Sequence, residues 1–225
     1  MEDAIQVFGY VWKWVDKGVT SQGKTTVGFW DQIDSRMMTY PGNMKEYYPD
    51  STFEDLTEAP PPMGPEVEVN IFVDASHADD KSDRKSVTGV FVYVGDMMVK
   101  SISKRQKSVA TSTFSSEFLA LKTAVEEAQS MRLLLQSIGV PTKKFINIHS
   151  DSESVLKSAA NPGHEIKRKH VSIAFHLARE NIATGVVRLW KIDTKLNPSD
   201  LLTKSLPRIP LSSHLERLKT NIRCD

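Results

Sequence analysis

The 225-residue sequence has little cysteine and no long apolar run, and each shortage excludes a class of protein. A single cysteine, Cys224, excludes an internal disulfide and suits a reducing compartment. No apolar stretch approaches the roughly 18 residues that a membrane span needs. The first residues lack the basic-then-apolar pattern of a secretory signal. We therefore expect a protein that is not secreted and has no membrane partner.

The net charge of +1 conceals an uneven distribution along the chain. Residues 1–70 contain 5 basic and 12 acidic side chains, a net charge of −7. Residues 71–225 contain 24 basic and 16 acidic side chains, a net charge of +8. A basic body of this kind suits a polyanion that is held through its phosphates, although an ordinary solvated surface can carry the same excess.

An acidic, proline-rich stretch at residues 49–65 prevents regular structure and predicts a linker. Before it, residues 4–17 have the apolar face of a short helix, and after it strand and helix patterns alternate. We place the domain boundary near residue 65. The predicted organisation is an appendage at 1–48, the linker at 49–65, one domain at 66–207 and a tail at 208–225.

The domain has the patterns of a mixed α/β sheet flanked by helices. Alternating apolar residues predict a strand at 67–74, and further strands are predicted at 89–94, 97–103, 145–150 and 186–192. The pair Gly95-Asp96 predicts a tight turn between the second and third of them. Apolar stripes predict helices at 113–137, where the spacing alternates between three and four, and at 168–184. Short helices are predicted at 152–160 and at 198–206, where Pro198 lies near the first turn.

Four acidic residues stand at predicted strand ends or helix starts, where a carboxylate packs poorly: Asp74, Glu117, Asp151 and Asp200. Glu117 continues the buried stripe of the helix at 113–137, so its carboxylate needs a partner or a cation. Taken singly, each has an ordinary explanation as a cap or a first-turn residue. Together, if they converge, they offer hard oxygen ligands suited to Mg²⁺ or Mn²⁺.

Five blocks of the sequence occur in a recognisable order and spacing: VDASHADDKSDRKSVTG (73–89), SKRQKSVATSTFSSEFLAL (103–121), HSDSESV (149–155), KRKHVSIAFHLARE (167–180) and NPSDLLTKSLP (197–207). Through these blocks, from about Glu66 to Pro207, the sequence resembles the ribonuclease H domain of copia-type LTR retrotransposon polyproteins. Residues 1–48 are similar, more weakly, to the segment that connects reverse transcriptase to ribonuclease H in those polyproteins.

The resemblance implies an RNase H-like fold, with a five-stranded mixed sheet flanked by helices and a small N-terminal appendage. It also implies a two-metal hydrolase that uses Mg²⁺ or Mn²⁺ to cleave the RNA strand of RNA–DNA hybrids. Asp74 would contact both ions, Glu117 and Asp151 the ion nearer the leaving oxygen, and Asp200 the ion nearer the attacking water. The implied partners are the hybrid and an upstream reverse transcriptase domain.

The resemblance implies a location in a cytoplasmic virus-like particle or in the nucleus. It also implies that further residues contact nucleic acid. By analogy with the fold, the Ser76 hydroxyl would lie near a ribose or phosphate. The loop at 193–199 has no histidine, whereas cellular ribonucleases H carry one there. Basic residues in two clusters are candidate phosphate contacts, with a solvated face as the alternative: Lys104, Arg105 and Lys107, and Lys167, Arg168 and Lys169.

Two other functions are compatible with parts of the sequence. The chain contains no Tyr-x-Asp-Asp polymerase motif, so a catalytically silent, nucleic-acid-binding remnant of a transposon polyprotein is the main alternative. An integrase or transposase of the same superfamily needs a glutamate after its second aspartate. Glu180 follows Asp151 by 29 residues, but it lies in the middle of a predicted helix among polar neighbours. The order of the four acidic residues therefore favours the ribonuclease.

Overall fold

The computed structural model describes most of the chain between residues 35 and 206. The described residues are 35–40, 43–77, 84–95, 97–107, 109–110, 112–163, 169–204, 206, 211 and 214, except for the side chains of 169–171. The helix predicted at 4–17 and nearly all of the tail predicted at 208–225 lie outside them. In the described part, no helix has the length and apolarity needed to cross a membrane.

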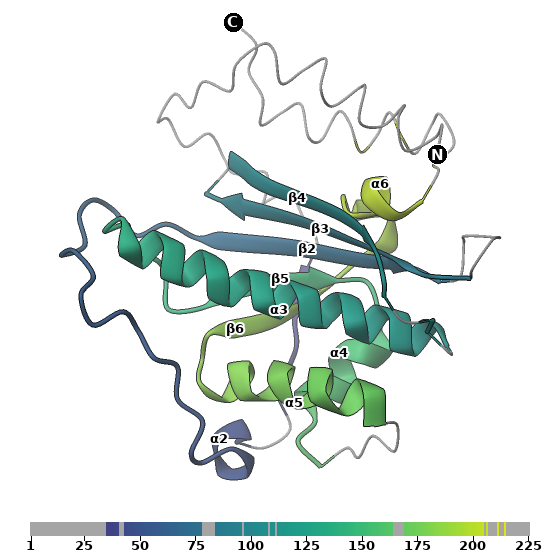
Figure 1. Ribbon diagram of the computed structural model, residues 1–225, viewed down its shortest axis with the longest axis horizontal. Coiled ribbons are helices and arrows are strands. Elements are labelled where there is room, and N and C mark those ends of the chain that lie inside the picture. The colour runs from purple at the N-terminus through teal and green to yellow at the C-terminus, as the bar shows by residue number, and fades with distance from the viewer. Residues whose placement is uncertain are drawn as a thin grey trace, which may run out of the picture.

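The described residues form one sheet with helices packed on it (Figure 1). In chain order, the strands are β1 (Ser35–Met37), β2 (Val69–Ser76), β3 (Val87–Val94), β4 (Met97–Arg105), β5 (Ile146–Ser150) and β6 (Val187–Ile192). The helices are α2 (Met44–Tyr47), α3 (Thr113–Ser137), α4 (Glu153–Ala160), α5 (Lys169–Ala183), the 3₁₀ turn η2 (Thr194–Leu196) and α6 (Asp200–Thr203). The predicted mixed α/β architecture is confirmed.

The strands lie in the order β1-β6-β5-β2-β3-β4. β2, β3 and β4 form an antiparallel meander, while β5 pairs in parallel with β2 on one side and with β6 on the other. The helical crossovers α3 and α4–α5 fall where parallel strands require them. The two strands in the middle, β2 and β5, run in parallel, so their carboxyl ends meet at one edge of the sheet.

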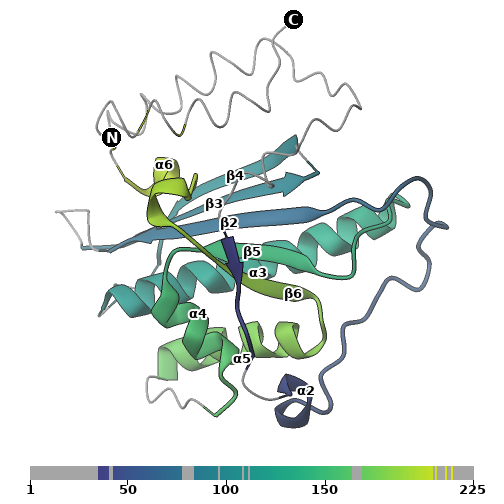
Figure 2. The same ribbon diagram turned by 180° about the vertical axis from the view of Figure 1, so that it is seen from behind.

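The predicted count of five strands was wrong by one, because β1 adds a sixth strand antiparallel to β6 (Figure 2). β1 has three residues, Ser35-Arg36-Met37, which are too few to show alternation. Next to it, the Met38 amide donates to the Leu189 carbonyl at 2.9 Å, and Met38 and Met44 are buried in the main core. The boundary near residue 65 stays a prediction, while packing with the sheet extends back to residue 35.

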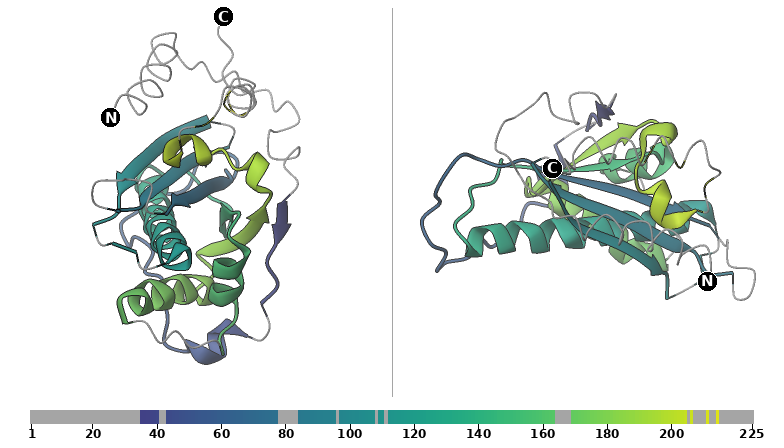
Figure 3. Two further views of the ribbon diagram at one scale, coloured as in Figure 1. Left: turned by 90° about the vertical axis from the view of Figure 1, so that its right-hand side faces the viewer. Right: turned by 90° about the horizontal axis from the view of Figure 1, so that it is seen from above.

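Helices α3, α4 and α5 cover one face of the sheet, and α6 lies on the other (Figure 3). The predicted apolar stripe of α3 is buried throughout: Leu121, Ala124, Ala128, Met131 and Leu135. The opposite face carries a second, smaller core of Phe72, Phe91, Tyr93, Ile192 and Leu201. β2 lies between the two cores, with Ile71 in one and Phe72 in the other, so it is buried along its whole length, including its polar residues.

Gly89 allows α6 to approach the sheet. It pairs with Asp74 across the β2–β3 ladder. A Cβ at Gly89 would lie 2.6 Å from Thr203 Cγ2, 2.9 Å from Leu202 Cβ and 2.9 Å from the Ser199 carbonyl oxygen. All three atoms belong to α6 or to the turn before it, so any larger side chain at residue 89 would push α6 away from Asp74.

We predict that Gly89→Ala lowers the free energy of unfolding by about 1–3 kcal/mol, the usual cost of adding a methyl group to a packed interface. Urea denaturation measures it. Gly163→Ala is the matched control, because a Cβ there would meet only Asn161 Oδ1, at 3.6 Å. Equal stability of the two variants would contradict the close packing of α6 on β3.

Candidate metal centre

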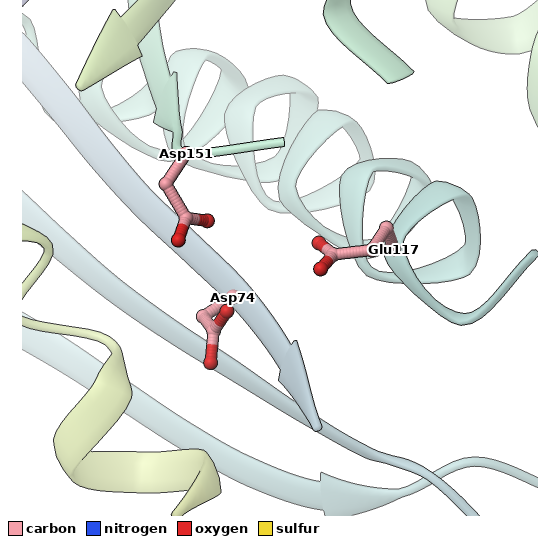
Figure 4. Close-up of side chains that lie close together, drawn as sticks. All are labelled: Asp74, Glu117 and Asp151. Atoms are coloured by element: carbon pink, nitrogen blue, oxygen red, sulfur yellow. The ribbon is translucent and has the colours of Figure 1, made fainter. Parts of the chain in front are cut away.

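Three of the four predicted acidic residues bring their side chains together (Figure 4). Asp74 comes from β2, Glu117 from α3 and Asp151 from the residue after β5. One carboxylate oxygen from each lies within 4.8 Å of the others. Asp74 is buried, whereas Glu117 and Asp151 are half-buried. The cluster therefore has a closed inner side and an accessible outer side.

The central strands place the two aspartates. Val73 is paired with Ser150 in the parallel β2–β5 ladder, so the residues that follow them, Asp74 and Asp151, are neighbours at the carboxyl edge of the sheet. The chain turns at once after β5, where the Ser152 amide donates to Ser150 Oγ at 3.2 Å. Asp151 Oδ1 is buried and has no hydrogen-bond partner among the described residues.

Gln106 and the start of α3 place Glu117. Ser112 caps the helix, and its side chain accepts a hydrogen bond from the Ser115 amide. The buried Gln106 Nε2 donates to Thr88 Oγ1 at 3.0 Å and to the Ser116 carbonyl oxygen at 2.8 Å. Gln106 thus joins β3, beside the strand that carries Asp74, to the turn of α3 that carries Glu117.

Asp200 reaches the same region through the loop after β6. The fully buried Asn197 Nδ2 donates to the Val73 carbonyl at 3.0 Å, next to Asp74. From the other side, Ser103 Oγ of β4 donates to the Leu202 carbonyl at 2.7 Å. These two hydrogen bonds fix the first residue of α6, Asp200, near the buried carboxylate.

Two residues that sequence reasoning missed contact Asp74 directly. Thr203 Oγ1 donates to Asp74 Oδ2. The ammonium of Lys204 lies 3.2 Å from Asp74 Oδ2 and 2.8 Å from Asp200 Oδ1. The available signal was the spacing, because a residue four positions after Asp200 lies on the same face of a helical turn.

Burial and like charges disfavour ionisation at this centre. Burial, together with the neighbouring charges of Asp74 and Asp151, raises the pKa of Glu117 to about 8. Burial also raises the pKa of Asp200, and the charge of Asp74 adds to that rise, while Lys204 opposes it. Full ionisation of the four carboxylates therefore requires more positive charge than Lys204 supplies.

The residues present fit a divalent cation. Their donors are carboxylate oxygens, the ligands that Mg²⁺ and Mn²⁺ prefer. Asp151 Oδ1 is such an oxygen, and it is buried without a hydrogen-bond partner in the described part of the chain. A cation between Asp74, Glu117 and Asp151 would also offset the burial and the repulsion that raise the pKa of Glu117. The oxygens of Asp200 lie on the Lys204 side of Asp74.

The other predicted contacts are described only in part. Ser76 is buried, and its Oγ accepts a hydrogen bond from the Val87 amide at 3.3 Å. Lys104, Arg105 and Lys107 are exposed at the end of β4. The second basic cluster lies outside the described side chains: Lys167, Arg168 and Lys169. Contact of any of these residues with nucleic acid stays a prediction.

The strand order and the helices on one face give the chain a ribonuclease H-like fold, as predicted. Solved structures with a similar arrangement include three ribonucleases H. The N-terminal RNase H domain of rv2228c from Mycobacterium tuberculosis is 11% identical, covers 69% of this chain and 96% of its own, and has a TM-score of 0.47. RNase H1 from the archaeon Halobacterium salinarum is 18% identical, with 60% and 94% coverage and a TM-score of 0.46. LC11-RNase H1 in complex with RNA/DNA hybrid is 16% identical, with 60% and 94% coverage and a TM-score of 0.47.

Sequence relatives point to transposons, although no protein-family model matches the chain. The retrovirus-related Pol polyprotein from transposon TNT 1-94 of Nicotiana tabacum is 32% identical over 137 residues, 61% of this chain and 10% of the polyprotein. The polyprotein from transposon RE1 of Arabidopsis thaliana is 28% identical over 155 residues, which are 69% of this chain and 11% of the polyprotein. The chain is thus similar to a segment of retrotransposon Pol polyproteins and spans about a tenth of their length, which confirms the predicted resemblance.

We predict that the metal-free protein loses stability as the pH rises toward 8, and that Glu117→Gln removes much of this loss. The pKa of Glu117 rises from 4.5 to about 8 on folding, so the folded state binds this proton more tightly than the unfolded state. The resulting stability is fully present below pH 4.5 and disappears as the pH passes 8. Urea denaturation between pH 5 and pH 9 in EDTA measures it.

Glu126→Gln is the control for this prediction, because Glu126 lies on the same helix and pairs with Lys122 on the surface. That variant should keep the pH dependence of the unmodified chain. An unchanged pH dependence in Glu117→Gln would contradict the assignment of the titration to this carboxylate.

Proposed function

We propose that this chain is a metal-dependent endonuclease that cleaves the RNA strand of RNA–DNA hybrids as part of a retrotransposon replication machinery. The observation that carries the proposal is the convergence of Asp74, Glu117 and Asp151 from three separate elements, within 4.8 Å of one another. The fold and the similarity to Pol polyproteins support the same reaction class. In hydrolysis by two metal ions, acidic side chains hold the cations that act on the phosphodiester.

The proposed roles follow the positions of the carboxylates. Asp74, the most deeply buried, would contact both ions from the middle of the cluster. Glu117 and Asp151 would hold the ion on the α3 side, and Asp200 the ion on the α6 side. Two Mg²⁺ or Mn²⁺ ions would supply an activated water and neutralise charge on the leaving 3′ oxygen. The carboxylates themselves would position the ions and would form no covalent bond with the substrate.

The proposed substrate would be recognised by shape, phosphates and ribose 2′-hydroxyls rather than by base edges. The exposed basic residues at the end of β4, Lys104, Arg105 and Lys107, would contact phosphates, as would Lys167, Arg168 and Lys169. An upstream reverse transcriptase domain would deliver the hybrid, joined through residues 1–48 and the linker at 49–65. We place the reaction in a cytoplasmic particle or the nucleus.

The test is incubation of the full chain with a labelled RNA–DNA hybrid in Mg²⁺ or Mn²⁺. We expect cleavage of the RNA strand, no cleavage of a DNA duplex of the same sequence, and a loss of about 100-fold or more in Asp151→Asn, because a metal ligand is removed. Asp50→Asn is the matched control, since Asp50 is exposed and far from the cluster in sequence.

The alternative, a silent remnant that binds nucleic acid, predicts a different result in the same experiment. It predicts that the hybrid binds without being cut, with equal affinity for the unmodified chain and for Asp151→Asn. Binding without cleavage under both metals would contradict the proposed activity.

A further inference from the structure

Lys204 lies between two carboxylates of the candidate centre. Its ammonium is 3.2 Å from Asp74 Oδ2 and 2.8 Å from Asp200 Oδ1. The two aspartates are 1% and 9% exposed at their side chains, whereas the Lys204 side chain is 35% exposed. The ammonium therefore reaches inward from the surface and ends at the buried side of the cluster.

The contact with Lys204 depends on the same packing that places Asp200. Lys204 follows the last residue of α6, and its amide donates to the Asp200 carbonyl at 3.0 Å, which closes the turn. The adjacent Thr203 donates to the same oxygen of Asp74, Oδ2. Both contacts require the close approach of α6 to Gly89. The fold thus fixes the backbone of Lys204 beside the two aspartates.

Charge balance explains why a cation lies there. Among the described residues, Lys204 is the basic side chain that forms ion pairs with this group of carboxylates. Burial acts to lower the pKa of Lys204, but the charge of Asp74 and the hydrogen bond to Asp200 outweigh it and raise that pKa. Without the ammonium, two poorly solvated carboxylates would face each other with no compensation.

We propose that Lys204 is the internal counter-cation of the Asp74–Asp200 pair, and that a divalent ion bound between these two carboxylates takes the place of its ammonium. The inference rests on the proposed function, because it assumes that a divalent ion binds at this centre. Lys204 is then a positioning residue. It holds the two ligands in place before the ion arrives, and its partly exposed stem lets the ammonium swing outward afterwards.

The exchange predicts opposite effects of Lys204 on stability and on metal affinity. The ammonium stabilises the metal-free fold and competes with the incoming ion. In Lys204→Met we expect a melting temperature about 3–8 °C lower in EDTA, since removing one partner leaves buried charge uncompensated. We also expect Mn²⁺ to bind about 3- to 10-fold more tightly at the weaker site, because no ammonium has to leave. The gain in melting temperature on adding Mn²⁺ should increase accordingly.

Three further variants isolate the charge of Lys204. Lys204→Arg keeps a cation and should resemble the unmodified chain, while Lys204→Gln keeps a hydrogen-bond donor without charge and should resemble Lys204→Met. Lys122→Met removes a lysine that pairs four residues along α3 with Glu126, on the surface, and should change neither quantity. The experiment uses the full chain, Mn²⁺ alone as the probe, and thermal unfolding with a Mn²⁺ titration at pH 7.5.

The outcomes separate this inference from the proposed function. Unchanged or weaker Mn²⁺ binding in both Lys204→Met and Lys204→Gln, with normal binding by the unmodified chain, overturns the exchange and leaves the metal site standing. Absence of Mn²⁺ binding in the unmodified chain and in every variant overturns the exchange and the proposed metal-dependent reaction together.

Discussion

Repulsion between carboxylates that are crowded at the centre of one sheet is the constraint on which the site depends. Asp74, Glu117 and Asp151 approach within 4.8 Å, and Asp200 is tied to the first of them through Lys204. In a partly buried position this arrangement costs free energy unless protons or cations compensate it. A proton that Glu117 keeps through its raised pKa is one such compensation, and the ammonium of Lys204 is another. A divalent ion would be a third.

The scaffold holds these groups with a small number of specific contacts. Parallel pairing of β2 with β5 brings two aspartates to one edge, and Gln106 ties the start of α3 to β3. Asn197 joins the last loop to the Val73 carbonyl, and Gly89 leaves room for α6. Hydrogen bonds and packing in the sheet, at the start of α3 and at α6 therefore oppose the repulsion between the carboxylates. Loss of any one of these contacts is expected to change the relative positions of the carboxylates.

Periodic patterns made most of the fold predictable. The long helix α3 was predicted with its observed bounds, and the five long strands were each predicted within two residues, because their apolar residues repeat regularly. β1 was missed because three residues contain too little pattern. Lys204, Thr203 and Gly89 were missed for a different reason. Thr203 and Lys204 contact Asp74 of β2, and α6 packs on Gly89 of β3, so their roles depend on residues far apart in the sequence, such as Thr203 and Asp74 at 129 positions. Only the four-residue spacing of Asp200 and Lys204 is a local signal.

If the four carboxylates hold divalent cations, the metal-free chain should bind a fixed number of them, and that number can be counted. Electron paramagnetic resonance of free Mn²⁺, titrated with the intact chain at pH 7.5, counts the bound ions. We expect two ions per chain, and fewer in Asp74→Asn, because Asp74 is the carboxylate proposed to contact both ions. Equal binding by the unmodified chain and by Asp74→Asn, or no binding by either, would contradict this expectation.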